Sequence, residues 1–168
     1  MTTDETPPLF HGTTEEFANR FVPTGLGPAP RRHLTVLACM DARLDLFRML
    51  GLENGDAHIL RNAGGIVTDD TVRSLVFSQH ALGTRHTVLV HHTDCGLHGV
   101  VDSEFLDRLE AATGQRPSWQ PGGFADPFED VRRSLAAVRS CPWLLSTSAQ
   151  GFVFDVETGE LIDAEATA

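Results

Sequence analysis

The sequence has little of several features that would assign a chain to a class at once. It has three cysteines in 168 residues, an odd and small number that argues against a framework of disulfide bonds. Its longest apolar runs, such as Thr87–Val90, are far too short to span a bilayer. The N-terminal segment 1–5 lacks the basic start and apolar core of a signal peptide, so we expect a cytoplasmic protein. No internal repeat or low-complexity tract is present.

Basic residues are also scarce. Thirteen Lys and Arg stand against 23 Asp and Glu, which gives a formal net charge of -10 at pH 7. This excess of negative charge argues against nucleic acid or an anionic membrane as the main partner. The composition is otherwise that of an ordinary globular protein, with 41% hydrophobic and 21% charged residues. A chain of this length fits one domain with a buried core.

Short apolar runs alternate with helix-like segments along most of the chain. The runs that predict strands are 33–38, 57–60, 87–90, 152–156 and, after a hairpin turn, 161–162. The segments with helical spacing and capping residues are 43–50, 68–82, 102–113 and 126–141. This alternation predicts an α/β fold with a mostly parallel central β-sheet flanked by helices, to which the terminal hairpin adds an antiparallel edge.

The N-terminal part has a different composition. Residues 1–12 predict a loose arm, and a Thr-x-x-Glu capping box at Thr13 begins a short helix. Prolines and glycines between residues 23 and 30 then form a connector. We therefore divide the chain into an arm, helix and connector, residues 1–30, and a single α/β domain, residues 31–168. The helix either packs on its own domain or reaches over a second subunit.

Metal-binding residue types follow two of the predicted strands. Cys39 and Asp41 follow the first strand, and His92 and Cys95 follow the third. The carboxyl ends of parallel strands meet at one edge of a sheet, where open α/β sheets bind their ligands. Two thiolates and an imidazole make three zinc ligands and leave a fourth position, which Asp41 either fills or leaves to water. The sequence therefore predicts one zinc ion per subunit, held by the domain of residues 31–168.

Other interpretations of these residues stay open. Cys39 and Cys95 could be buried thiols, although the combination of Cys-x-Asp-x-Arg with His-x-x-Cys argues against chance. A closed structural zinc site is the next alternative, but it would give Arg43 no purpose. A guanidinium two residues from Asp41 instead indicates a carboxylate held by a bidentate pair.

The remaining candidate ligands are less clear from spacing. His91 competes with His92, but successive strand residues face opposite sides, and the His-x-x-Cys spacing favours His92. His91 is then expected to be a core histidine or a residue that supports the site. His98, three residues after Cys95, is a candidate for proton transfer. Cys141 precedes Pro142 at a predicted helix end, and we expect it to be a packing residue.

These motifs resemble those of the β-class carbonic anhydrases. Residues 39–43 match the Cys-x-Asp-x-Arg of that family, residues 92–95 match its His-x-x-Cys, and residues 61–65 match the segment after its second strand. The likeness spans roughly residues 34–156 and is greatest to the small, single-domain, actinobacterial-type branch.

Two departures from the family pattern affect the predicted pocket. Many members carry an Ala-Asn pair where this chain has Gly64 and Gly65, and a second glycine where it has Leu97 after Gly96. We expect the changes to reshape the pocket wall. In particular, the glycine pair is expected to leave space for an atom larger than oxygen.

The resemblance implies a zinc enzyme that hydrates carbon dioxide reversibly to bicarbonate with a metal-bound hydroxide. Asp41 would orient that hydroxide while Arg43 holds Asp41 off the metal; if the pair breaks, Asp41 would become the fourth ligand of a closed state. It also implies a homodimer or homotetramer in which the N-terminal helix embraces a neighbouring subunit. The implied site residues are the ligands Cys39, His92 and Cys95, the catalytic pair Asp41 and Arg43, and the pocket residues Gly64, Gly65 and Gly96.

Two alternative functions remain at this point. Related members of the fold hydrolyse carbonyl sulfide or carbon disulfide with the same zinc hydroxide, and ligands alone do not separate these CO2-like substrates. The other alternative is a zinc-stabilised binding module without catalysis, against which the Asp41–Arg43 pair argues.

Overall fold

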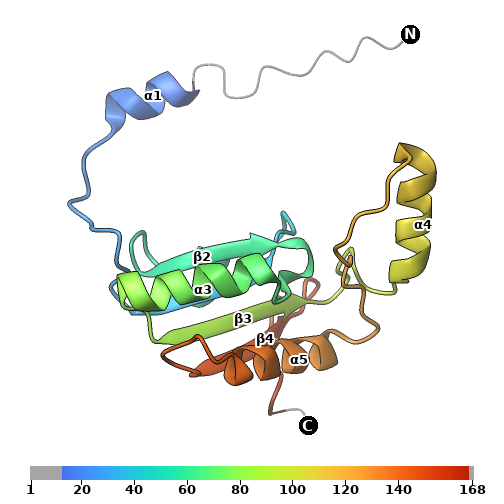
Figure 1. Ribbon diagram of the computed structural model, residues 1–168. Helices are drawn as coiled ribbons and strands as arrows, with labels where there is room; N and C mark the ends of the chain where they lie inside the picture. The colour runs from blue at the N-terminus through green and yellow to red at the C-terminus, as the bar shows by residue number, and fades with distance from the viewer. Residues whose placement is uncertain (1–12, 167–168) are drawn as a thin grey trace.

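The computed structural model describes residues 13–166, so the arm expected over residues 1–12 lies outside the described part. Its centre is a five-stranded sheet of order β2-β1-β3-β4-β5 (Figure 1). Strands β1 to β4 are parallel, and β5 pairs antiparallel with β4. This confirms the predicted mostly parallel sheet with an antiparallel edge. The strands are β1 Leu34–Cys39, β2 Ala57–Asn62, β3 His86–His92, β4 Ala149–Phe154 and β5 Leu161–Asp163.

Helices cover the sheet on one face, and loops with a short helix cover the other. The elements are α1 Thr13–Arg20, α2 Leu46–Leu50, a 3-10 turn Ala63–Gly65, α3 Asp69–Leu82, α4 Asp102–Thr113 and α5 Pro127–Ser140. Side chains alternate along β1, so Val36 packs with Leu46 of α2 whereas Leu37 packs with Leu75 of α3 and Leu135 of α5. Both faces of the central strands are therefore buried.

The structure corrects several predicted boundaries. The helix after β1 begins at Leu46, not at Arg43, because the Asp45 carboxylate accepts a hydrogen bond from the Arg48 amide and caps it there. Strand β3 extends to His92, and the last parallel strand begins at Ala149 instead of Phe152.

From its place at the start of the segment 102–113, the sequence predicts that Asp102 caps this helix, and that prediction is wrong. Asp102 is the first residue of α4, and its carboxylate accepts hydrogen bonds from the backbone amides of Gly122 and Gly123. It therefore ties the loop before α5 to the start of α4 and does not cap its own helix.

The N-terminal helix stands apart from the sheet. In Figure 1, α1 lies well away from the strands, and its side chains from residue 15 onward are exposed. The connector that follows is fixed to the domain, because His58 contacts the Pro28 carbonyl and Arg31 pairs with the buried Asp56. None of the helices between residues 13 and 166 is long and apolar enough to cross a membrane.

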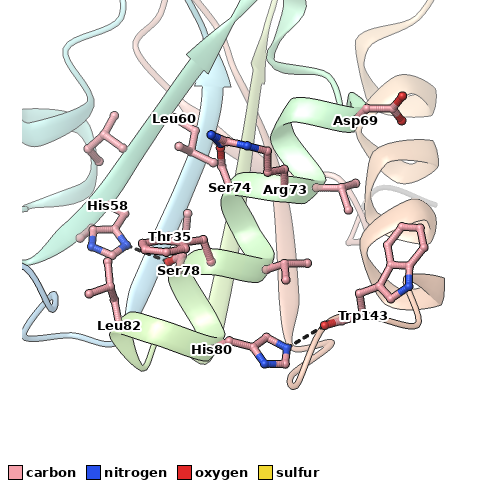
Figure 2. A pocket seen from close by; sticks show the side chains of 15 residues that line it. Thr35, His58, Leu60, Asp69, Arg73, Ser74, Ser78, His80, Leu82 and Trp143 are labelled. Atoms are coloured by element: carbon pink, nitrogen blue, oxygen red, sulfur yellow. Dashed lines mark hydrogen bonds between the residues drawn. The ribbon is translucent and has the colours of Figure 1, made fainter.

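A broad groove lies between edge strand β2 and helix α3. Its volume is about 1250 Å³, and aliphatic side chains such as Leu60 and Leu82 line it together with Trp143 (Figure 2). The rings of Trp143 and of Phe77 on α3 are 66% and 62% exposed. No segment between residues 13 and 166 therefore covers the sheet edge or this face of α3.

Candidate metal centre

Parallel pairing of β1 with β3 brings the two ligand motifs together. Leu34 to Ala38 pair with His86 to Val90, so both strands end at the same edge of the sheet. Cys39 ends β1 and His92 ends β3, while the turn after β3 carries Cys95. The two sulfurs lie 3.9 Å apart, and the three ligand atoms lie within 4.8 Å of one another. All three side chains are buried.

This group fits zinc. Two sulfurs at about 2.3 Å from a tetrahedral ion are about 3.8 Å apart, close to the separation found here. His92 Nδ1 donates to the Thr93 carbonyl at 2.8 Å, which leaves Nε2 without a hydrogen. That buried Nε2 has no hydrogen-bond partner among the described residues. An unpaired nitrogen beside two sulfurs is the donor set that zinc completes.

The two thiols are held at different pKa values. A hydrogen bond from Cys95, together with the His92 ring and the backbone amides of Asp41 and Gly64, lowers the pKa of Cys39 to about 4. The shared hydrogen bond with Cys39, and then burial, raise the pKa of Cys95. Cys39 is therefore the easier of the two thiols to deprotonate, and metal binding requires both to lose their protons.

Arg43 holds the Asp41 carboxylate beside this group. Arg43 Nε donates to Asp41 Oδ1 at 2.9 Å and Nη2 donates to Oδ2 at 2.8 Å, a bidentate pair. These bonds keep the pKa of Asp41 far below its usual range. Asp41 Oδ2 is 3.8 Å from His92 Nε2. The ionised Asp41 carboxylate thus lies beside the metal-binding group, and the Arg43 guanidinium holds that carboxylate in place.

Two supporting residues were missed by the sequence reasoning. Asp94 receives hydrogen bonds from Arg43 Nη1 at its carboxylate, 2.7 Å, and from Nη2 at its carbonyl, 2.9 Å. Arg61, at the end of β2, donates to the carbonyls of Cys39, Asp41 and Leu44. Arg61 therefore fixes the backbone on both sides of Asp41. The sequence signal for Arg61 was only its place in the matched segment.

The glycine pair leaves no spare room, contrary to the expectation from sequence. Both glycines have positive φ, and a Cβ on Gly65 would lie 2.7 Å from the Cys39 nitrogen. A Cβ on Gly64 would lie 2.7 Å from Leu97 Cδ1, so Leu97 occupies the space beside it. Gly96, by contrast, has nothing within 4 Å of its Cβ position. At both glycines, the space that a side chain would take is therefore already occupied, by the Cys39 backbone and by Leu97.

The other two candidate histidines, His91 and His98, differ in burial and in their contacts. His91 is fully buried, with its Nδ1 3.2 Å from Asp130 Oδ2, as expected for a core or supporting residue. His98 is exposed, contacts the Ala125 carbonyl and stacks on Phe124. Its suggested part in proton transfer stays a prediction. Cys141 is half-buried at the end of α5 and is not part of the metal group.

Comparison with known proteins decides the family. The family described as carbonic anhydrase matches residues 34–114. Beta-carbonic anhydrase 1 of Mycobacterium tuberculosis is 51% identical over 133 residues, which cover 79% of this chain and 82% of that protein. The chain belongs to the β-class carbonic anhydrase family. A carbonic anhydrase structure from Streptococcus mutans has a TM-score of 0.83 and 36% identity, covering 90% of this chain and 92% of its own.

The same family also includes proteins of another name. A carbon disulfide hydrolase from Acidithiobacillus thiooxidans is 50% identical to this chain, covering 77% of it and 71% of that protein. Zinc is the cofactor of β-carbonic anhydrases, and the Cys39, His92 and Cys95 group is able to bind it. The family therefore sets the metal chemistry, whereas substrate choice needs a separate argument.

We predict that Gly65→Ala weakens zinc binding about tenfold or more, because its Cβ would push against the Cys39 backbone. Gly99→Ala is the matched control, since Gly99 has φ +73 but nothing within 4 Å of its Cβ position. The control should lose only about 1–2 kcal/mol of stability from backbone strain. Competition with a chromogenic chelator measures the zinc affinity. Equal affinities in the two variants would contradict the close-packing role.

Proposed function

We propose that this protein is a zinc lyase that hydrates carbon dioxide reversibly to bicarbonate. The observation that carries the proposal is the position of the ionised Asp41 carboxylate. Arg43 holds this carboxylate, and Asp41 Oδ2 lies 3.8 Å from His92 Nε2, the nitrogen that faces the metal site. A closed structural site has no use for such a pair. The 51% identity to a β-carbonic anhydrase supports the same assignment.

Each residue then has a defined part. Zinc, held by Cys39, His92 and Cys95, would supply a Lewis acid that lowers the pKa of a bound water to about 7. Asp41 Oδ2 accepts a hydrogen bond from the attacking water. This bond directs the lone pair of the water oxygen at the carbon of CO2. Arg43 engages both oxygens of Asp41 and so keeps the carboxylate off the fourth ligand position. The product is bicarbonate, and the released proton passes to solvent.

A closed state follows from the same geometry. Because Asp41 is so near the metal group, loss of its pair with Arg43 would let the carboxylate turn and become the fourth ligand. The pKa of Asp41 lies far below its usual range, so the carboxylate itself stays charged at any physiological pH. We therefore place the control of opening in the Arg43 contacts, including those to Asp94, and not in protonation of Asp41.

Hydrolysis of carbonyl sulfide or carbon disulfide is the second candidate. The carbon disulfide hydrolase relatives favour it, since the same metal chemistry attacks all these linear molecules. The glycine pair gives it no support, because Leu97 fills the space beside Gly64. A non-catalytic binding module is the third reading, and it leaves the Asp41–Arg43 pair unexplained.

A side-by-side measurement of kcat/KM with CO2, carbonyl sulfide and carbon disulfide on zinc-loaded protein separates these candidates. We expect the value for CO2 to exceed the other two, since Leu97 already occupies the space beside Gly64 that a larger sulfur atom would need. A higher value for either sulfur compound would assign the protein to the hydrolases. No turnover of any of the three would favour a binding module.

The variant Arg43→Ala tests the role of the pair. We expect kcat/KM for CO2 to fall about 100-fold or more, because Asp41 is no longer held in position, while zinc content stays unchanged. Arg48→Ala is the control, since Arg48 is a nearby arginine whose side chain is 90% exposed. Stopped-flow CO2 hydration gives the rates and atomic absorption gives the zinc. Unchanged turnover in Arg43→Ala would remove the dyad from the mechanism.

We also propose that the protein works as a homodimer or larger homo-oligomer in the cytoplasm. Residues 13–166 leave the apolar groove along β2 and α3 uncovered. Phe17 of α1 and Phe21 just after it are 66% and 54% exposed, with ring centroids 5.7 Å apart. A second copy that lays α1 on this groove would bury both surfaces. Residues 1–30 would then serve assembly and residues 31–168 catalysis. A reducing compartment suits the ligand thiols, which lie 3.9 Å apart without a disulfide.

Sedimentation velocity on Phe77→Asp tests the assembly. We expect the parent to sediment as a dimer or larger and the variant as a monomer, because the new charge would lie in the covered groove. Leu145→Asp provides the control: Leu145 is 69% exposed and lies outside the groove, so its mass should equal that of the parent. A monomeric parent, or a Phe77→Asp variant of unchanged mass, would count against the proposed interface.

A further inference from the structure

A buried chain of polar contacts runs from helix α5 to the metal centre. His91 is 0% exposed and Asp130 4%. His91 Nδ1 lies 3.2 Å from Asp130 Oδ2, and His91 Nε2 lies 3.1 Å from the Gly65 carbonyl oxygen. Arg133, one turn further along α5, pairs with the same carboxylate from the surface. The proposed reaction uses neither His91 nor Asp130.

Two contacts restrict the His91 imidazole. Its Nε2 donates to the Gly65 carbonyl, and its Nδ1 faces the Asp130 carboxylate without meeting hydrogen-bond geometry. The Phe124 ring lies alongside, with ring centroids 6.3 Å apart. Burial raises the pKa of Asp130, but His91 and Arg133 outweigh it and keep that pKa below its ordinary value. Removing a partner from a buried carboxylate is strongly destabilising, so Asp130 depends on these contacts.

The Gly65 carbonyl connects this chain to a metal ligand. The Gly64–Gly65 turn packs so closely on β1 that a Cβ on Gly65 would meet the Cys39 nitrogen at 2.7 Å. The turn therefore lies directly against the backbone of a proposed metal ligand. A shift of this turn would displace the end of β1, which carries the Cys39 sulfur.

We propose that His91 and Asp130 are positioning residues that hold the Gly64–Gly65 turn against the Cys39 backbone and so keep the Cys39 sulfur in place. Asp130 faces the imidazole, the imidazole holds the Gly65 carbonyl, and the turn supports the end of β1. Groups that support metal ligands in this way set both metal affinity and the charge that the ligand transfers to the metal. The inference rests on the proposed zinc site, but its test requires no turnover.

The experiment compares His91→Leu with His91→Gln. Leucine fills similar space without a donor, whereas the glutamine amide keeps a donor for the Gly65 carbonyl. We expect His91→Leu to weaken zinc binding about tenfold or more, as measured by chelator competition. The sulfur-to-metal charge-transfer band of its cobalt-substituted form should also shift. His91→Gln should restore both properties most of the way to the parent.

Val131→Ala supplies the control for general destabilisation. Val131 is a buried α5 residue next to Asp130 that packs in the core on the helical face of the sheet. We expect it to lower the unfolding temperature and to leave the cobalt band in place. If His91→Leu does not fold, Asp130→Leu tests the same chain from its other end, with the same expected loss of affinity and band shift.

Parent-like zinc affinity and cobalt band in the folded leucine variant would overturn the proposal. So would a band shift in Val131→Ala as large as that in His91→Leu, because the band would then report stability alone. Failure of the proposed activity would be a different result, namely no CO2 turnover by the parent protein. The measurements of zinc affinity and of the cobalt band would still test the roles of His91 and Asp130.

Discussion

Parallel pairing of β1 with β3 is the constraint on which the rest of the molecule depends. Cys39 and Cys95 are 56 positions apart in the sequence, yet the register that pairs Leu34 with His86 brings their sulfurs to 3.9 Å. Both strands are buried on both faces, so a slip of one residue would turn the ligands toward the wrong side of the sheet. The packing of the core therefore also fixes the positions of the metal ligands.

Around that centre, several side chains hold the loops by donating hydrogen bonds to backbone carbonyls. Arg61 binds carbonyls on both sides of Asp41, Arg43 binds the Asp94 carbonyl, and His91 binds the Gly65 carbonyl. Backbone contacts of this kind fix loops without blocking the ligand atoms themselves. Asp41 is the exception: within residues 13–166, its carboxylate accepts two hydrogen bonds from the Arg43 guanidinium and one from the Arg43 backbone amide. The position of this carboxylate therefore depends on Arg43.

Much of the fold and of the ligand set could be predicted from the sequence. Buried strands appear as continuous apolar runs, and residues at the ends of parallel strands meet at one edge, so Cys39, His92 and Cys95 could be grouped before any coordinates. The helix that begins at Leu46 and not Arg43 could not be foreseen, because local helical propensity there yields to capping by Asp45.

Contacts between distant segments could not be predicted from the sequence either, because they depend on tertiary packing. No local pattern places Asp130 of α5 beside His91, because that contact depends on how a helix packs across the sheet. The space beside Gly64 was misjudged in the same way. A glycine pair indicates room only when nothing else fills it, and Leu97, from a different loop, does so here.

The central claim is that Cys39, His92 and Cys95 hold one zinc ion and leave its fourth position free of further thiolate or imidazole. X-ray absorption spectroscopy at the zinc edge of the purified protein tests this most directly. We predict one zinc per chain with two sulfurs at about 2.3 Å and the remaining shell of nitrogen and oxygen. A shell without two sulfurs, or protein that binds no zinc and instead links Cys39 to Cys95, would contradict the account.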